Sequence, residues 1–248
     1  MASSRFLLHR TNIPATFGLK DEEKRNFCYI CLAVNHFRKL GGRSVKIDLA
    51  KLDVAGAHGF MVGAVLPRPI AWVSTLGEDG VYNLAPFSFF TALSSKPAVV
   101  GFGVGRKRDG RKKDTLVNVE FSKDFVINMV TEAIAAAMNH TSGEYPSHVD
   151  EFKEAGLTAI KSDLVKPPRV AESPVNLECR LLQILEFGEP PRINSFVIGE
   201  VLRAHVRDEL WEKGLIQGEQ LRAIGRMGED FYCRTMDRFE MKRPKIGP

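Results

Sequence analysis

Short apolar runs separated by turn-forming residues dominate the chain after residue 44. The runs are of strand length, rich in Val, Ile and Phe, and bounded by Pro, Gly or charged residues, which is typical of β-strands in a compact domain. We therefore predict strands over residues 62–66, 70–75, 99–104, 125–130, 176–185, 196–206 and 236–241.

Helical signals are fewer. Asp114 or Thr115 is expected to cap one helix, and the alanine-rich residues 133–139 and residues 149–155 are expected to form two more. The chain shows no repeat of βαβ units of about 30 residues each. The pattern indicates a mainly β protein with few helices, built as a barrel and not as a Rossmann fold.

The net charge of +5 is confined to the N-terminal segment. Residues 1–43 carry eight Lys or Arg and three Asp or Glu, which leaves 27 charges of each sign in the rest of the chain. A domain with balanced charge has no positive field that would attract a polyanion, so we expect no nucleic-acid partner. No apolar run approaches the roughly 20 residues that span a bilayer, so we expect no membrane partner either.

Residues 1–44 form an N-terminal extension, and residues 45–248 form the predicted domain. The first 20 residues contain three basic and no acidic side chains, which resembles an organelle-targeting sequence. A disordered extension or an artefact of the start site is the alternative. Apart from such targeting, we expect a cytoplasmic protein.

The four cysteines are too few for a disulfide framework. Cys28 and Cys31 form a CxxC motif without a second pair or a histidine at metal-binding spacing. Cys179 lies in an apolar strand and is expected in the core. We predict reduced cysteines and no metal site.

The stretch RPIAWVSTLGEDGVYNLAPFSFF, residues 68–90, is the most informative part of the chain. A buried strand ends in the hydroxyl residues Ser74 and Thr75, and after a turn small or polar residues alternate with large apolar ones from Asn83 to Ser88. Small residues let the backbone approach a ligand closely, and hydroxyl groups reach its polar edges. The stretch therefore indicates a site for a flat, partly polar ligand.

The charged loop RKRDGRKKDT, residues 106–115, follows an apolar strand and precedes the first expected helix. A helix N-terminus offers free backbone N–H groups and a partial positive charge, and basic residues from Arg106 to Lys113 would add to it. The loop indicates a site for a single phosphate group; a solvated surface loop is the alternative.

The glycines of GFGVG, residues 101–105, lie inside a strand, whereas a dinucleotide-binding motif must open a helix. We interpret them as a strand that passes close to another body, either part of the chain or a flat ligand. The polar loop after His140, residues 141–146, forms a lid or a simple connection. No catalytic triad or carboxylate pair is present, so any chemistry is expected to come from a cofactor.

Together these segments resemble the flavin reductase-like family, in the branch that shares an FMN-binding split β-barrel with flavoredoxin. The matching segments are RPIAWVST (68–75), NLAPFSFF (83–90), SSKP (94–97), KDTLVN (113–118), KPPRVAESPVNLECR (166–180) and GRMGEDFYCRTMDRFEM (225–241). The resemblance leaves out the N-terminal extension, and Lys112 stands where relatives often have proline.

The resemblance implies a homodimer that binds FMN near the subunit interface, with NADH or NADPH as electron donor. The implied cofactor-binding residues are Ser74, Thr75, Asn83, Leu84, Ala85, Pro86, Phe87, Ser88, Ser94, Ser95, Arg106, Lys113, Asp114 and Thr115. Hydroxyls and the 113–115 loop would hold the phosphate and ribityl chain, and residues 83–88 would lie along the flavin ring. We expect an NAD(P)H-dependent flavin reductase; a flavoredoxin-like electron carrier and a non-enzymatic FMN-binding protein for storage or sensing are the alternatives.

Overall fold

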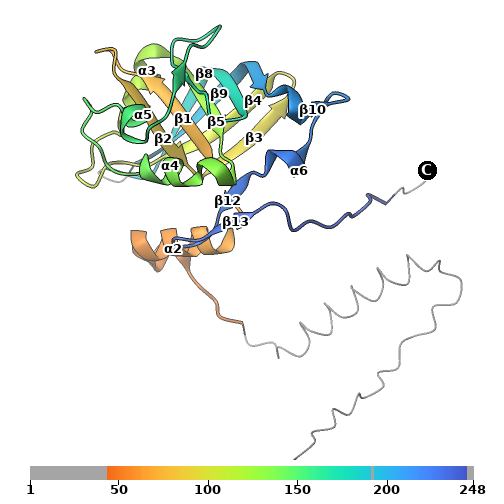
Figure 1. Ribbon diagram of the computed structural model, residues 1–248. Coiled ribbons are helices and arrows are strands. Elements are labelled where there is room, and N and C mark those ends of the chain that lie inside the picture. The colour runs from red at the N-terminus through yellow and green to blue at the C-terminus, as the bar shows by residue number, and fades with distance from the viewer. Residues whose placement is uncertain (1–43, 191–192, 245–248) are drawn as a thin grey trace, which may run out of the picture. The chain divides into compact units, whose positions relative to one another are not determined.

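The computed structural model describes residues 44–190 and 193–244 (Figure 1). The chain divides into two compact units, Met1–Leu52 and Asp53–Pro248. Of the first unit, the described part contains the 3-10 helix η1 (Leu49–Lys51), which Asp48 caps. The expected targeting signal and the CxxC motif lie outside the described residues, and a domain boundary at residue 44 stays a prediction.

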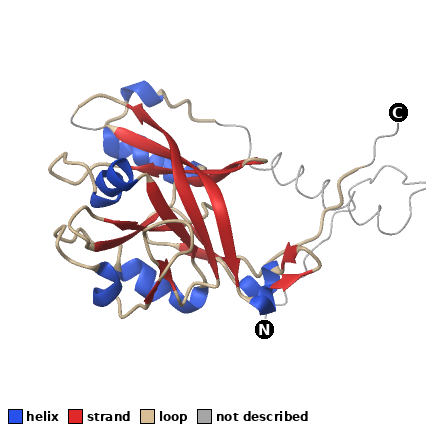
Figure 2. Ribbon diagram, turned by 90° about the horizontal axis from the view of Figure 1, so that it is seen from above, coloured by secondary structure: helices blue, strands red, loops and turns tan. Residues whose placement is uncertain are grey.

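The second unit is built around one antiparallel seven-stranded sheet with the order β2-β1-β5-β8-β9-β4-β3. Its strands are β1 (Ala71–Leu76), β2 (Tyr82–Phe87), β3 (Phe90–Ser95), β4 (Ala98–Val104), β5 (Asp124–Met129), β8 (Val175–Phe187) and β9 (Asn194–Val206). The long pair β8–β9 contains two register shifts, which bend the strands and let the sheet curve (Figure 2). The mainly β fold with few helices is confirmed.

Short two-stranded sheets and short helices complete this unit. The small strands are β6 (Ala159–Ile160), β7 (Arg169–Val170), β10 (Trp211–Glu212), β11 (Leu215–Ile216), β12 (Ile224–Arg226) and β13 (Tyr232–Arg234). The helices are α2 (Val54–Ala64), α3 (Asp114–Ser122), η2 (Glu132–Ile134), α4 (Ala135–His140), α5 (Glu151–Glu154), η3 (Asp208–Leu210) and α6 (Gly218–Leu221).

Strand β1 is buried on both faces, and this gives the unit two cores. Ala71 and Val73 pack into the cluster around Phe102 and Phe125. Trp72, on the opposite face of β1, packs with Phe152 from α5 into the other cluster. A continuous apolar strand is expected to lie between two packed layers, and β1 does so.

Five of the strands predicted from apolar runs are present as β1, β4, β5, β8 and β9. The three predicted helical regions are also found, although the alanine-rich helix begins as the 3-10 turn η2 and continues as α4. The expected cap of α3 is wrong: the cap residue is Lys113, which makes no side-chain capping bond, and Asp114 lies in the first turn. Cys179 is buried in the core as expected.

Two strand predictions are wrong. Residues 62–66 form the end of helix α2 and the turn after it, because Asp53 accepts a hydrogen bond from the Gly56 N–H and starts a helix that runs through them. Residues 236–241 are not a strand: β13 ends at Arg234, which already pairs with Ile224, the first residue of β12. Strands β2 and β3 were not predicted, because Pro86 and the small residues interrupt their apolar pattern.

The glycines of residues 101–105 confirm the interpretation of a strand that passes close to another body. A side chain at Gly101 would collide with the Phe196 ring, and a Cβ atom at Gly103 would lie 3.1 Å from Cβ of Phe89. The neighbouring body at these two positions is therefore the chain itself.

Gly199 on β9 is under the same constraint and supplies a stability test. A Cβ atom there would collide with the ring of Phe125, which is fully buried. We expect Gly199→Ala to lower the free energy of unfolding by about 1–3 kcal/mol, as overpacked cores do, measured by urea denaturation. Gly105→Ala is the control, since its Cβ would meet Asn194 Oδ1 at an ordinary 3.6 Å; equal effects of the two variants would contradict the steric explanation.

Candidate functional site

A small pocket lies where β2 meets the N-terminus of α3. Six of the residues proposed for the cofactor line it: Asn83, Ala85, Pro86, Lys113, Asp114 and Thr115. The loop after α4, from Thr141 to Tyr145, and Glu151 also line the pocket. The loop 141–146 therefore borders the candidate site, as the lid interpretation requires.

A larger groove of about 720 Å³ adjoins this pocket and shares Pro86, Lys113 and Ser142 with it. Phe87 and Ser88 from the proposed set also line the groove. Helix α2 and the segment around β12 and β13 form its other walls. Ligand sites of small molecules are commonly about 300–1,000 Å³ and mostly apolar, so the groove has room for a flat organic molecule.

Buried hydrogen bonds fix the pocket wall. The Asn83 Oδ1 atom accepts from the hydroxyls of Thr115 (2.8 Å) and Thr75 (3.2 Å), and Thr75 accepts from the Asn118 amide (3.0 Å). Thr75 and Thr115 are almost fully buried. Their hydroxyls therefore join α3 to β1 and β2, which holds the helix N-terminus at the pocket.

Glu151 completes this network, although no motif in the sequence pointed to it. Its carboxylate accepts from the Asn83 amide (2.8 Å) and from the Leu84 N–H (3.0 Å). Burial raises the pKa of Glu151, these hydrogen bonds oppose the rise, and the nearby Asp114 adds to it. The residue lies in the predicted helix 149–155, where a lone acid looks like a surface residue.

Lys113 is the basic residue that the pocket and the groove share. Burial lowers its pKa, Glu144 opposes this and Lys107 adds to it. Its Nζ atom lies 5.8 Å from the centre of the Phe87 ring. Lys107 pairs with Asp114 at 2.7 Å. A partly desolvated ammonium group beside a helix N-terminus favours an anion.

The other members of the proposed set lie elsewhere. The Ser74 hydroxyl donates to the Pro168 carbonyl (2.5 Å), and Leu84 packs into the core beside Trp72. Ser94 and Ser95 are exposed at the end of the β3–β4 hairpin. Arg106 donates to Ser195 and Glu186 on β9 and β8 (3.0 Å each). The residues that line the pocket and the groove include none of these five: Ser74, Leu84, Ser94, Ser95 and Arg106.

Two arginines of the groove were also missed. Arg68 and Arg226 line its far end, next to Met227. A signal for Arg68 was present, because a charged residue directly before a buried strand must find partners inside the fold. Arg226 lies in the matching segment 225–241 but carried no motif of its own.

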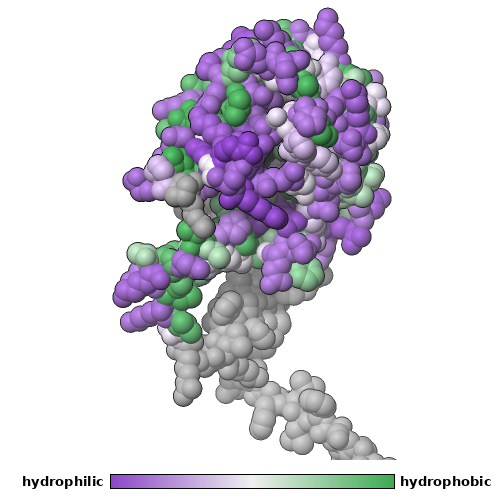
Figure 3. Space-filling view, turned by 90° about the vertical axis from the view of Figure 1, so that its left-hand side faces the viewer, coloured by the Kyte–Doolittle hydropathy of each residue, from purple (hydrophilic) through white to green (hydrophobic). Residues whose placement is uncertain are grey.

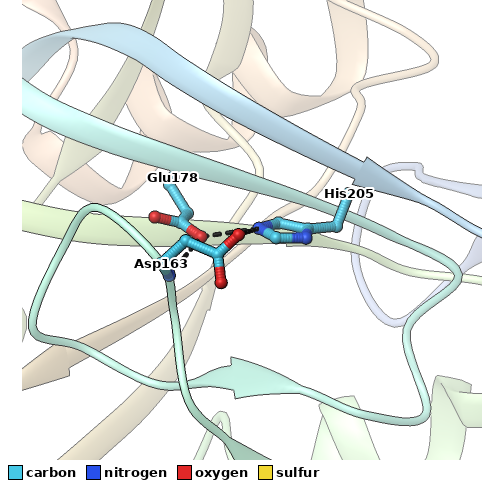
Figure 4. A group of neighbouring side chains, drawn as sticks. All are labelled: Asp163, Glu178 and His205. Carbon is cyan, nitrogen blue, oxygen red and sulfur yellow. Dashed lines mark hydrogen bonds and ion pairs between the residues drawn. The ribbon is translucent and has the colours of Figure 1, made fainter.

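Asp163, Glu178 and His205 form a separate cluster (Figure 4). His205 Nε2 lies 2.6 Å from Glu178, whose two oxygens also accept the N–H groups of Asp163 and Leu164. Burial raises the pKa of Glu178, but these hydrogen bonds outweigh it and hold the pKa below its usual range. Arg203 donates to Asp163 (2.6 Å). With its acceptors occupied in this way, the cluster joins the 163–164 loop to β8 and β9.

The described residues contain no helix long and apolar enough to cross a membrane. The face seen in Figure 3 is mainly hydrophilic, with apolar side chains scattered between polar ones.

The fold thus combines an antiparallel, curved sheet with a groove lined by apolar and polar side chains, and Lys113 caps the N-terminus of α3 beside it. The family model "Flavin reductase like domain" matches residues 62–225. The chain belongs to the flavin reductase-like family.

The chain is also similar to individual bacterial proteins. An uncharacterized protein of Halalkalibacterium halodurans is 40% identical over 206 residues, which are 82% of this chain and 98% of that protein. Nitrilotriacetate monooxygenase component B from Bacillus cereus is 31% identical with a TM-score of 0.78, covering 81% of this chain and all of that one. The 2-nitrobenzoate 2-nitroreductase of Pseudomonas fluorescens is 30% identical with a TM-score of 0.74, covering 82% and 98%.

The predicted split-barrel fold is confirmed by these comparisons, since a Shewanella frigidimarina protein with a split barrel domain matches at 22% identity with a TM-score of 0.69. The family and its oxidoreductase neighbours support a flavin-binding oxidoreductase.

Proposed function

We propose that the protein binds FMN in the groove and the adjoining pocket and accepts electrons from NADH or NADPH. The observation that carries the proposal is the position of the N-terminus of α3 and Lys113 at the junction of the two cavities. A flat ring fits against apolar side chains in the groove, and a phosphate group fits beside a helix N-terminus with a half-buried lysine. Bound flavin would supply hydride and electron transfer.

Different residues of this chain would then bind the phosphate group, border the flavin ring and position the helix. Lys113 and the first N–H groups of α3 would hold the phosphate group, and the segment from Ala85 to Ser88 would border the ring. Thr75, Asn83 and Thr115 would act as positioning residues, because their side chains bond to one another and fix α3 against β2. The loop 141–146 would limit the access of water to the phosphate end.

We further propose a homodimer. Leu182, Leu185 and Phe187 on β8 and Leu93 on β3 are exposed apolar side chains of one sheet. Exposed apolar surface of this kind commonly marks a protein contact. Light scattering during size-exclusion chromatography should give twice the mass of 27.7 kDa; a monomeric mass at micromolar concentration would contradict the dimer.

Anaerobic stopped-flow mixing tests the electron donor. Protein saturated with FMN should lose its visible flavin absorption when NADH or NADPH is added, and faster than free FMN does. If flavin binds but neither nucleotide bleaches it, the protein is a carrier that receives electrons from another protein, or a flavin-storage or sensing protein, and the reductase proposal is wrong.

A further inference from the structure

Two guanidinium groups occupy the end of the groove away from the basic N-terminus of α3. Arg68 and Arg226 face each other in an antiparallel backbone bridge, in which each N–H donates to the other's carbonyl (2.9 and 2.8 Å). Both line the groove. Neighbouring positive charges repel each other, so their presence together needs an explanation.

Arg68 is a fixed and buried charge. Only 5% of the residue is exposed, and its guanidinium donates to the carbonyls of Val62, Val65 and Met227 and to the Ser88 hydroxyl. These acceptors carry no formal charge, and within the described residues no carboxylate lies within 4 Å of it. Burial lowers the pKa of Arg68, and the charge of Arg226 lowers it further. Within the described residues, the charge of Arg68 is therefore not paired with a carboxylate.

Arg226 is the accessible member of the pair, with a quarter of its side chain exposed. Its guanidinium lies 4.6 Å over the Tyr232 ring and donates to the Glu229 carbonyl. Its nearest carboxylate, Asp230, is 3.6 Å away and fully exposed, and such a pair contributes little. The contact with Tyr232 restricts the movement of the guanidinium group, and such a group can bind two oxygens of one anion.

Apolar side chains surround these charges. Ile70, Phe89 and Met227 line the same end of the groove, and Arg68 lies 5.9 Å from the centre of the Phe89 ring. Charges act more strongly beside apolar walls than in bulk water. Glu229 and Asp230 also line the groove, but both side chains belong to the exposed turn before β13.

We propose that Arg226, supported by the charge of Arg68, binds the phosphate or carboxylate group of the second substrate, the molecule that exchanges electrons with the flavin. The proposal rests on the proposed function, because it assigns the opposite end of the same groove. It names the substrate class: a flat organic molecule that carries an anionic oxygen group. Phosphate would come from a nicotinamide dinucleotide, and carboxylate from an aromatic acid.

Isothermal titration calorimetry of FMN-saturated protein tests the assignment, with inorganic pyrophosphate and benzoate as the two probes. We expect wild type to bind at least one probe, and Arg226→Gln to weaken that binding about tenfold or more, the size of one charge-assisted contact. Arg226→Lys should fall between them, because it keeps the charge and loses the paired geometry. Arg222→Gln is the matched control, since Arg222 lies outside the groove lining and pairs with Glu132.

The outcomes are distinct. If Arg226→Gln weakens the binding of pyrophosphate, the anionic group of the second substrate is a phosphate. If it weakens the binding of benzoate, the group is a carboxylate. The proposal is overturned if neither probe gives heat on binding. It is also overturned if Arg226→Gln and Arg222→Gln bind the probes with equal affinity while the thermal stability of both variants is unchanged. Flavin fluorescence in the same samples reports FMN binding separately. If the proposed function is wrong, the protein does not quench flavin fluorescence, and this result is independent of anion binding.

Discussion

Lys113→Ala is expected to weaken FMN binding by about 10- to 100-fold, because a charge-assisted hydrogen bond to phosphate is worth roughly 1.5–3 kcal/mol. The substitution leaves the fold in place, since Lys113 caps α3 with its backbone and not with its side chain. Fluorescence titration of FMN against the purified variant measures the change.

Two controls isolate the phosphate contact. Lys112→Ala removes the neighbouring lysine, which pairs with Glu120 at 2.7 Å and lies outside the lining of the pocket and the groove, so FMN affinity should stay close to wild type. Riboflavin has no phosphate, so Lys113→Ala should change its affinity far less than that of FMN. Equal losses for FMN and riboflavin would contradict a phosphate site at Lys113.

Glu151→Ala is expected to lower the free energy of unfolding by about 2–4 kcal/mol, because it leaves two buried donors without their acceptor. These donors are the Asn83 amide and the Leu84 N–H. Urea denaturation measures the loss. Glu154→Ala on the same helix is the control, since Glu154 is exposed and its removal should cost little. A loss for Glu151→Ala no larger than for Glu154→Ala would show that the network does not hold the pocket wall.

The same carboxyl predicts a dependence of stability on pH. Burial raises the pKa of Glu151 above its ordinary value of 4.5, so folding favours the protonated form. The difference in free energy of unfolding between wild type and Glu151→Ala should be largest below pH 4.5. This difference should fall as the pH rises through the pKa that Glu151 has in the folded state. Denaturation curves of both proteins across this range measure it; a difference that grows with pH would show that the pKa is lowered instead.

The central strands could be predicted because each is a continuous apolar run. Strand β1 is buried on both faces, and β4, β5, β8 and β9 carry the residues of the core between them. Helix α2 could not be distinguished from a strand, since its sequence is apolar all round and none of its residues is fully buried. Its placement depends on Arg68, which donates to the carbonyls of Val62 and Val65 at the end of this helix. That contact is invisible in the local pattern.

The candidate site was predicted in part. Asn83, Pro86 and Lys113 border the pocket because β2 and the start of α3 each bring a matching segment to the same place. The hydroxyls of Thr75 and Thr115 bond to Asn83 inside the wall, and Thr115 also lines the pocket. Their contact with a ligand stays a prediction. Glu151 and Arg226 reach the site from distant segments, and a single sequence does not reveal which distant residues meet.

Titration of FMN into purified, flavin-free protein tests the central claim most directly. We expect saturable quenching of flavin fluorescence with one FMN bound per chain, and a perturbed visible spectrum of the bound flavin. Folded protein that leaves both the fluorescence and the spectrum of FMN unchanged would contradict it.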